Sequence, residues 1–229
     1  SNRQVQIGFP VRTTPGEAKQ DWKLIVELAK RCGLNWDYKN VSAVYEEMAS
    51  TMSSLNNISW QRLEKEGAVC YPVDDETSFG NEILFSEGFP TSNGKAKIVP
   101  ADLMPPDEKP NKKYPFILTT GRLLEHWHTG AMTRRSSMLE AQEPIPTVSM
   151  HPYDIRKLGL KRGENVLVET QRGIIEILLR EDRDVSKGML FIPFCFTESP
   201  ANKLTNPHLD PYGKIPEFKY AAARVYKVN

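Results

Sequence analysis

A proline- and charge-rich run divides this chain of 229 residues into two parts with different sequence patterns. The run, MPPDEKPNKK over residues 104–113, carries three prolines and five charged side chains. That composition is typical of an extended connection. Apolar residues before it recur at helical spacing, whereas those after it form short stretches typical of strands. The sequence therefore predicts a helical and irregular part over residues 1–104, a linker over 105–113, and a strand-rich domain over 114–229.

The first part shows three helical patterns followed by a long irregular stretch. A threonine cap and a proline at the first helical position predict a helix over residues 14–33. Two further helices are predicted over residues 42–52 and 59–67 from their apolar stripes and caps. Residues 68–100 are rich in turn signals, and Asn93-Gly94 predicts a hairpin there. Such a set makes a poor independent core, so we predict that it is a partial segment of a larger α/β domain.

The second part reads as a series of short strands. Five apolar stretches predict them, at residues 116–118, 166–170, 174–179, 189–196 and 221–228. Arg172-Gly173 separates two of these stretches as the turn of a hairpin, and His151 opens a short helix that Gly159 ends. Many short strands with one or two small helices predict a closed β-barrel. The expected class for the whole chain is α+β.

Composition excludes several kinds of partner. The net charge is +1, which argues against a basic surface for nucleic acid or for a charged membrane. No apolar run approaches the roughly 20 residues of a membrane span. The cysteines, Cys32, Cys70 and Cys195, are isolated from one another, so neither a zinc site nor an iron–sulfur site is expected from this chain.

The densest polar chemistry follows the first predicted strand of the second part. The segment YPFILTTGRLLEHWHTGAMTRR, residues 114–135, turns at Gly121 and then carries two histidines, a tryptophan and three arginines. Glycines let a backbone approach a ligand closely, and arginines can bind phosphate oxygens in a forked geometry. The segment therefore predicts a cradle for a large anionic, heteroaromatic ligand. Ordinary loop packing and a His-x-His metal pair stay open as alternatives, although only Glu125 is near enough to join such a pair.

Three stretches resemble one known family. TGRLLEHWHTGAMTRR, HPYDIRKLGLKRGENVLVETQRGIIE and ANKLTNPHLDPYGKIPEFKYAAARV resemble the C-terminal domain of molybdopterin-dependent oxidoreductases, in the branch of formate dehydrogenases and periplasmic nitrate reductases. The resemblance implies that residues 114–229 form a six-stranded double-psi β-barrel. It also implies that residues 1–104 are the C-terminal part of an upstream α/β domain of such an enzyme.

The same resemblance implies a ligand and the residues that hold it. The ligand is molybdopterin guanine dinucleotide, two copies of which hold one molybdenum or tungsten atom. The residues expected to line it are Thr120, Gly121, Arg122, Glu125, His126, Trp127, His128, Thr129, Asn202 and Lys219, with Phe194 near the substrate funnel. In the family, the catalytic and metal-ligating residues and the iron–sulfur cluster lie upstream of the matching region. No catalytic or metal-ligating residue is therefore expected here.

Three functions follow as hypotheses. The first is the C-terminal portion of a formate dehydrogenase, which oxidises formate to carbon dioxide with release of two electrons; by itself this portion is expected to be inactive. The closing stretch NPHLDPYGKIPEFK favours it, and it resembles the soluble, NAD-linked kind, which predicts a cytoplasmic location and partner electron-transfer subunits. The second is a portion of a periplasmic-type nitrate reductase. The third is a stand-alone, non-catalytic pterin-binding module.

Overall fold

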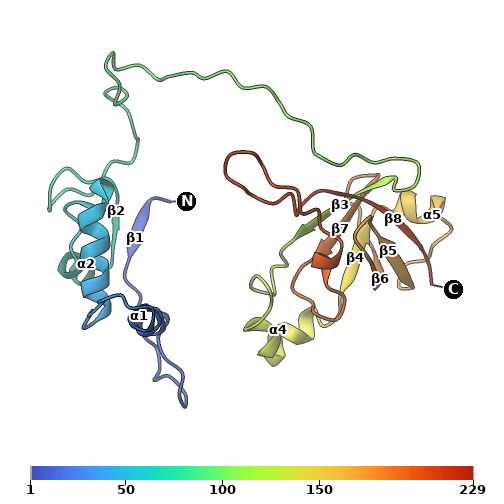
Figure 1. The fold of residues 1–229 in the computed structure, drawn as a ribbon, viewed down its shortest axis with the longest axis horizontal. Coiled ribbons are helices and arrows are strands. Elements are labelled where there is room, and N and C mark those ends of the chain that lie inside the picture. Colours follow the sequence, from blue (N-terminus) through green and yellow to red (C-terminus); the bar gives the residue numbers. More distant parts are fainter. Residues whose placement is uncertain (1, 229) are drawn as a thin grey trace. The chain divides into compact units, whose positions relative to one another are not determined.

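The computed structural model describes residues 2–228, and the chain divides into two compact units, Ser1–Pro100 and Ala101–Asn229 (Figure 1). The first unit contains α1 (Asp21–Arg31), α2 (Val41–Thr51), the 3₁₀ turn η1 (Ser53–Leu55) and α3 (Trp60–Glu66). Its strands β1 (Gln4–Gln6) and β2 (Ala68–Cys70) pair antiparallel. The helices and this small sheet enclose a modest core of Tyr45, Ala49, Leu55, Ile58, Leu63, Val69 and Val73.

The helices of the first unit begin where caps and backbone geometry allow. The predicted start of the first helix at residue 14 is wrong, because α1 begins at Asp21. Gly16 has a φ of +52°, outside the right-handed helical region, and residues 15–18 form only a turn. The third helix is confirmed: Ser59 Oγ accepts a 3.1 Å hydrogen bond from the Arg62 amide, and Gly67 follows the last turn with a φ of +78°. None of the helices described over residues 2–228 is long and apolar enough to cross a bilayer.

The predicted hairpin at Asn93-Gly94 is also wrong. The Phe89 amide donates a 2.9 Å hydrogen bond to the Gly94 carbonyl, so a turn forms there. Residues 71–115 nevertheless contain no strand. The flanking residues 79–99 include large apolar side chains that are mostly exposed, such as Phe79 and Ile98. A turn without a buried face on either side cannot hold two strands together.

The second unit is a closed barrel of six strands, as predicted. Its strands follow the order β3-β7-β4-β6-β5-β8 around the barrel. Their bounds are β3 (Phe116–Gly121), β4 (Thr147–Met150), β5 (Asn165–Glu169), β6 (Ile174–Glu181), β7 (Met189–Pro193) and β8 (Ala221–Lys227). The connections contain η2 (Thr133–Arg135), α4 (Ser137–Gln142), α5 (Pro152–Lys157) and η3 (Ala201–Lys203). The predicted hairpin around Arg172-Gly173 is confirmed as the β5–β6 pair, and His151 caps α5 by accepting from the Tyr153 amide at 3.0 Å.

The barrel interior is fully apolar at its centre. Val148, Met150, Val166, Leu190 and Ile192 have essentially no exposed surface. Strand β4 was not among the predicted strands. Its sequence, Thr147-Val148-Ser149-Met150, alternates polar and apolar residues over only four positions, the shortest stretch that indicates a strand. All four residues are buried, so the polar positions do not form a face open to solvent. Closure of the barrel leaves no free sheet edge, because β3 pairs with both β7 and β8.

Part of the predicted linker is packed onto the barrel. Glu108 is buried, with 8% of its surface exposed. One of its oxygens pairs with the Arg172 guanidinium, and the other accepts a 2.8 Å hydrogen bond from the Ala222 amide. Residues 101–113 therefore lie within the second unit, and the buried carboxylate holds them to both β8 and the β5–β6 turn.

Candidate functional site

Strand register brings the predicted site residues to one end of the barrel. Parallel pairing places Gly121, at the end of β3, opposite Pro193, at the end of β7. Antiparallel pairing of β3 with β8 places the start of β8 at the same end, with Leu118 opposite Ala221. The β5–β6 turn lies there too, because β6 runs parallel to β4, which runs antiparallel to β7. We call this the site end of the barrel. In Figure 1, α4 lies beyond it and α5 lies at the other end.

Thr120 connects two of the segments that meet at the site end. Its side chain is buried, and its hydroxyl donates a 3.0 Å hydrogen bond to the Phe218 carbonyl. Phe218 directly precedes Lys219, the predicted cationic contact in the last connection. The threonine therefore holds the segment before β8 against the end of β3.

Gly121 is required by packing at the same place. A Cβ atom there would lie 2.5 Å from Cε2 of Phe191, on the neighbouring strand β7. The Gly121 carbonyl accepts a 3.2 Å hydrogen bond from the Phe194 amide. Phe194, the predicted funnel residue, is half-buried and packs partly on the barrel core. The glycine therefore lets β7 and its following segment lie close to the start of the polar loop.

Arg122 projects from this rigid strand end with its guanidinium free. The residue is exposed, and within residues 2–228 it forms neither a hydrogen bond nor an ion pair. Glu125, the nearest carboxylate in sequence, is half-buried and makes no ion pair with it. A structural Arg122–Glu125 pair is thus absent from the part of the chain that the structure describes. The charge of Arg122 is available to an external anion.

His126 differs from its predicted role. Its side chain is buried, its Nε2 lies 2.8 Å from the Glu143 carbonyl, and its Nδ1 lies 3.4 Å from the Thr133 hydroxyl. The ring meets the buried Phe196 ring edge-on, with 5.7 Å between centroids. Both ring nitrogens and one ring edge are therefore used inside the protein. His126 supports the polar loop from within and does not line its surface.

The next three predicted residues form an exposed turn. Trp127, His128 and Thr129 are all open to solvent, and the Gly130 amide closes the turn by donating to the Trp127 carbonyl at 2.8 Å. His128 has a φ of +48°, a left-handed conformation that histidine tolerates better than most residues. The Trp127 and His128 rings lie 4.9 Å apart in an edge-on arrangement. A flat indole and an imidazole are thus presented side by side.

The remaining two predicted residues come from the last connection, residues 194–220. Asn202 lies in η3, which the Thr170 hydroxyl holds at the β5–β6 turn by donating to the Leu204 carbonyl at 3.0 Å. Lys219 lies beside the segment that Thr120 holds. Both are exposed, and neither side chain has a hydrogen bond or ion pair within the described residues 2–228. The segments that carry the predicted site residues therefore all reach the site end. The exposed side chains themselves extend from loops.

Sequence reasoning placed Arg134 in the ligand cradle but missed its structural role and its partners Glu140 and Glu198. Arg134, Glu140 and Glu198 form a cluster in which the arginine binds both carboxylates. No sequence pattern links Glu198 to Arg134, because the two meet only through the pairing of β3 and β7. Within residues 2–228 there is no group of three or more His, Cys, Asp or Glu arranged to hold a metal ion.

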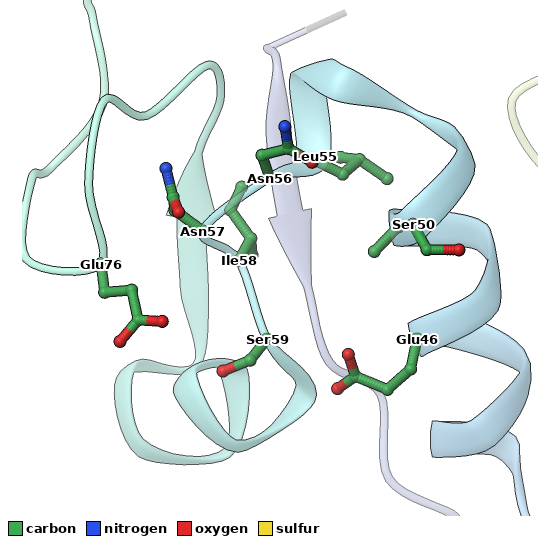
Figure 2. Close-up of a pocket in the computed structure, with 9 residues that line it drawn as sticks. Glu46, Ser50, Leu55, Asn56, Asn57, Ile58, Ser59 and Glu76 are labelled. Carbon is green, nitrogen blue, oxygen red and sulfur yellow. The ribbon is translucent and has the colours of Figure 1, made fainter.

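Two of the hollows in the structure differ in their relation to these residues. Figure 2 shows the one in the first unit, a pocket of about 220 Å³ that includes Glu46, Asn57 and Glu76. Glu46 accepts a 2.8 Å hydrogen bond from the Trp60 amide, so it serves the start of α3. The other, of about 920 Å³, lies in the second unit between residues 104–107 and 208–220. Its lining includes Glu217 and Tyr220, which flank the segment carrying Lys219.

Similarities to known proteins agree with this geometry. Residues 116–222 match the family described as the molydopterin dinucleotide binding domain. The chain is 37% identical over its whole length to the F420-dependent formate dehydrogenase subunit alpha of Methanocaldococcus jannaschii, of which it covers 34%. It is 30% identical to the assimilatory nitrate reductase catalytic subunit of Bacillus subtilis, with 95% of this chain and 32% of that protein covered. The chain thus spans about a third of the length of these relatives.

A solved structure shows the same fold. The acetylene hydratase from Pelobacter acetylenicus superposes with a TM-score of 0.71 and 23% identity, covering 99% of this chain and 35% of that one. At that identity the likeness concerns the fold alone. Together with the six-stranded barrel and the match over residues 116–222, the sequence similarities confirm the predicted resemblance. The barrel unit of this chain belongs to the molydopterin dinucleotide binding domain family.

Proposed function

We propose that the chain is the C-terminal, cofactor-binding part of a formate dehydrogenase catalytic subunit, and that the site end holds molybdopterin guanine dinucleotide. The observation that carries this proposal is a set of exposed polar side chains with no partner among residues 2–228. They are Arg122, His128, Thr129, Asn202 and Lys219. All of them extend from segments that the barrel fixes at one end.

The chemistry of this set fits the dinucleotide. A guanidinium and an ammonium suit pyrophosphate oxygens, and a hydroxyl and an amide add uncharged hydrogen bonds. The exposed Trp127 indole offers a flat face to a heteroaromatic ring. Thr120 and Gly121 contribute indirectly, since they fix the strand end from which Arg122 projects. The chain's own residues therefore bind and orient the ligand.

In the whole enzyme, two dinucleotides hold one molybdenum or tungsten atom, and this centre supplies the oxidation of formate to carbon dioxide and two electrons. The metal ligands and an iron–sulfur cluster belong, on this proposal, to the remainder of the catalytic subunit. Electron-transfer subunits are its partners, and the cytoplasm is its location. The formate dehydrogenase relative of Methanocaldococcus jannaschii is named for F420 and not for NAD. The proposal therefore does not extend to an NAD acceptor.

A nitrate reductase is the second candidate, supported by the Bacillus subtilis relative. The closing stretch NPHLDPYGKIPEFK favours formate dehydrogenase, because it resembles the end of that enzyme. The whole catalytic subunit, assayed with formate and with nitrate in separate dye reactions, distinguishes the two. Formate-dependent dye reduction is expected, and nitrate turnover without formate turnover would overturn the assignment.

Direct binding tests the chain itself. The 229-residue protein is titrated anaerobically with molybdopterin guanine dinucleotide released from an enzyme that carries it, and tryptophan fluorescence is followed. We expect saturable quenching that the Trp127→Phe variant loses, while the loaded chain shows no formate-dependent dye reduction. Absence of saturable binding by the folded wild-type chain would remove the cofactor assignment. The chain would then be a module that does not bind this dinucleotide.

A further inference from the structure

One arginine behind the proposed site joins three separate segments of the barrel unit. Arg134 Nε and Nη2 lie 3.2 and 3.0 Å from the two carboxylate oxygens of Glu140, in α4. Its Nη1 and Nη2 lie 2.8 and 2.7 Å from the two oxygens of Glu198, in the connection after β7. Two forked contacts of this kind require the planar guanidinium and are not available to lysine.

The aliphatic part of the same side chain supports the exposed turn. A Cβ atom at Gly130 would lie 2.7 Å from Arg134 Cγ and 3.1 Å from the Cys195 carbonyl oxygen, and Gly130 has a φ of +73°. The Gly130 carbonyl also accepts a 3.0 Å hydrogen bond from the Arg134 amide. Gly130 closes the turn that carries His128 and Thr129. Arg134 therefore packs directly against the base of that turn.

The contact extends into the barrel through Phe196. The guanidinium carbon of Arg134 lies 4.8 Å from the centroid of the Phe196 ring, within the range of a cation–π interaction. Phe196 is fully buried and also meets the His126 ring edge-on. The polar loop after β3 and the connection after β7 are thus packed around one aromatic ring.

We infer that Arg134 is a positioning residue, which fixes the turn at residues 127–130 relative to the segment at residues 194–199 and so sets the geometry of the ligand-binding groups. Its side chain is 17% exposed and makes four hydrogen bonds within the protein, in contrast to the free Arg122. It acts through the turn and does not itself contact the ligand. The ligand part of this inference rests on the proposed function.

The experiment compares four variants of the 229-residue chain. Arg134→Gln removes both forked contacts, Arg134→Lys keeps the charge, and Glu198→Gln weakens one contact at a carboxylate that is 54% exposed. Arg224→Gln is the matched control, because Arg224 makes a comparable pair with Glu169 between β8 and β5. Each variant is measured for its melting temperature, for amide hydrogen exchange by segment, and for its dissociation constant for molybdopterin guanine dinucleotide.

We expect Arg134→Gln to raise amide exchange in residues 127–130 and 194–199, and to weaken dinucleotide binding about tenfold or more. Arg134→Lys should recover only part of the exchange protection and of the dinucleotide affinity. Glu198→Gln should show a smaller increase in amide exchange in the same two segments. Arg224→Gln lowers the melting temperature without raising exchange in those segments.

Unchanged amide exchange in the folded Arg134→Gln variant, or an equal increase in the Arg224→Gln control, would overturn the inference. Full dinucleotide affinity in a folded Arg134→Gln chain would also overturn it. If the wild-type chain binds no dinucleotide, the proposed function fails, and the exchange data still decide whether Arg134 fixes the turn.

Discussion

The Nε2 atom of His126 lies 2.8 Å from the Glu143 carbonyl oxygen, while the ring of His128, two residues later, is open to solvent. We therefore predict that the two alanine substitutions lower stability to different extents. His126→Ala leaves that carbonyl without this partner and should lower the free energy of unfolding by about 1–3 kcal/mol. His128→Ala should change it by less than about 0.5 kcal/mol. Urea denaturation of both variants checks this, and equal losses would contradict the burial difference.

Arg122 should matter to the ligand and not to the fold. Arg122→Ala removes a charge that has no partner within residues 2–228, so the melting temperature should be unchanged. Loss of one charge-assisted contact should weaken dinucleotide binding by about 1.5–3 kcal/mol. Arg122→Lys should recover only part of the lost affinity, because an ammonium cannot donate two parallel hydrogen bonds as a guanidinium does. Cofactor content per folded protein is the measurement, and full content in Arg122→Ala would end the ligand role.

Glu108 should be a stability determinant although it lies in a proline-rich run. Its buried carboxylate pairs with Arg172 and accepts from the Ala222 amide. Removal of one partner of a buried ion pair leaves the other charge, here that of Arg172, without compensation. Glu108→Ala should therefore destabilise the barrel by about 3 kcal/mol. Asp107→Asn is the control, since Asp107 is half-exposed and should cost less than about 0.5 kcal/mol. Similar losses of unfolding free energy in the two variants would show that the buried contacts of Glu108 do not stabilise the barrel.

Acid should reduce the contribution of Arg134. Hydrogen bonds from Arg134 lower the pKa of Glu198 from 4.5 to about 2, and the same arginine lowers the pKa of Glu140. A carboxylate with a lowered pKa stabilises the fold above its unfolded pKa and loses that contribution as the pH falls toward its folded pKa. The difference in unfolding free energy between wild type and Arg134→Gln should therefore be largest near neutral pH. It should shrink from about pH 4.5 downward, and a difference that widens on acidification would contradict the pairing.

Limited proteolysis should separate the units upstream of the predicted linker. Lys95 and Lys97 lie in an exposed stretch without strands or helices. Lys112 and Lys113 lie beside Asn111, whose side chain accepts hydrogen bonds from the Lys113 and Tyr114 amides. Trypsin should cut after the first pair before the second, leaving a resistant barrel fragment. Early cleavage after Lys112, followed by digestion of the barrel, would show that residues 101–113 are not held to it.

The sequence predicted helix ends correctly where a capping residue within a few positions determines them. Ser59 and Gly67 bound α3, and His151 caps α5, because caps act within a few residues. The same reasoning placed Thr14 at a helix start, where Gly16 instead turns the chain. The roles of His126 and Arg134 could not be read from sequence. Their environments depend on Glu143, Phe196 and Glu198, which strand pairing brings from other parts of the chain.

The pairing of β3 with β7 and β8 has a consequence for the order of folding. Strand β3 leaves the ribosome well before either neighbour. One side of it can form its hydrogen bonds only once β7 has been made, and the other side only once β8 has been made. Parallel and long-range pairings of this kind give a high contact order and slow folding. The strand that precedes the polar loop therefore lacks both of its neighbours until β7 has been made. The site end, which uses segments on both sides of β3, is therefore assembled only after β8 has been made.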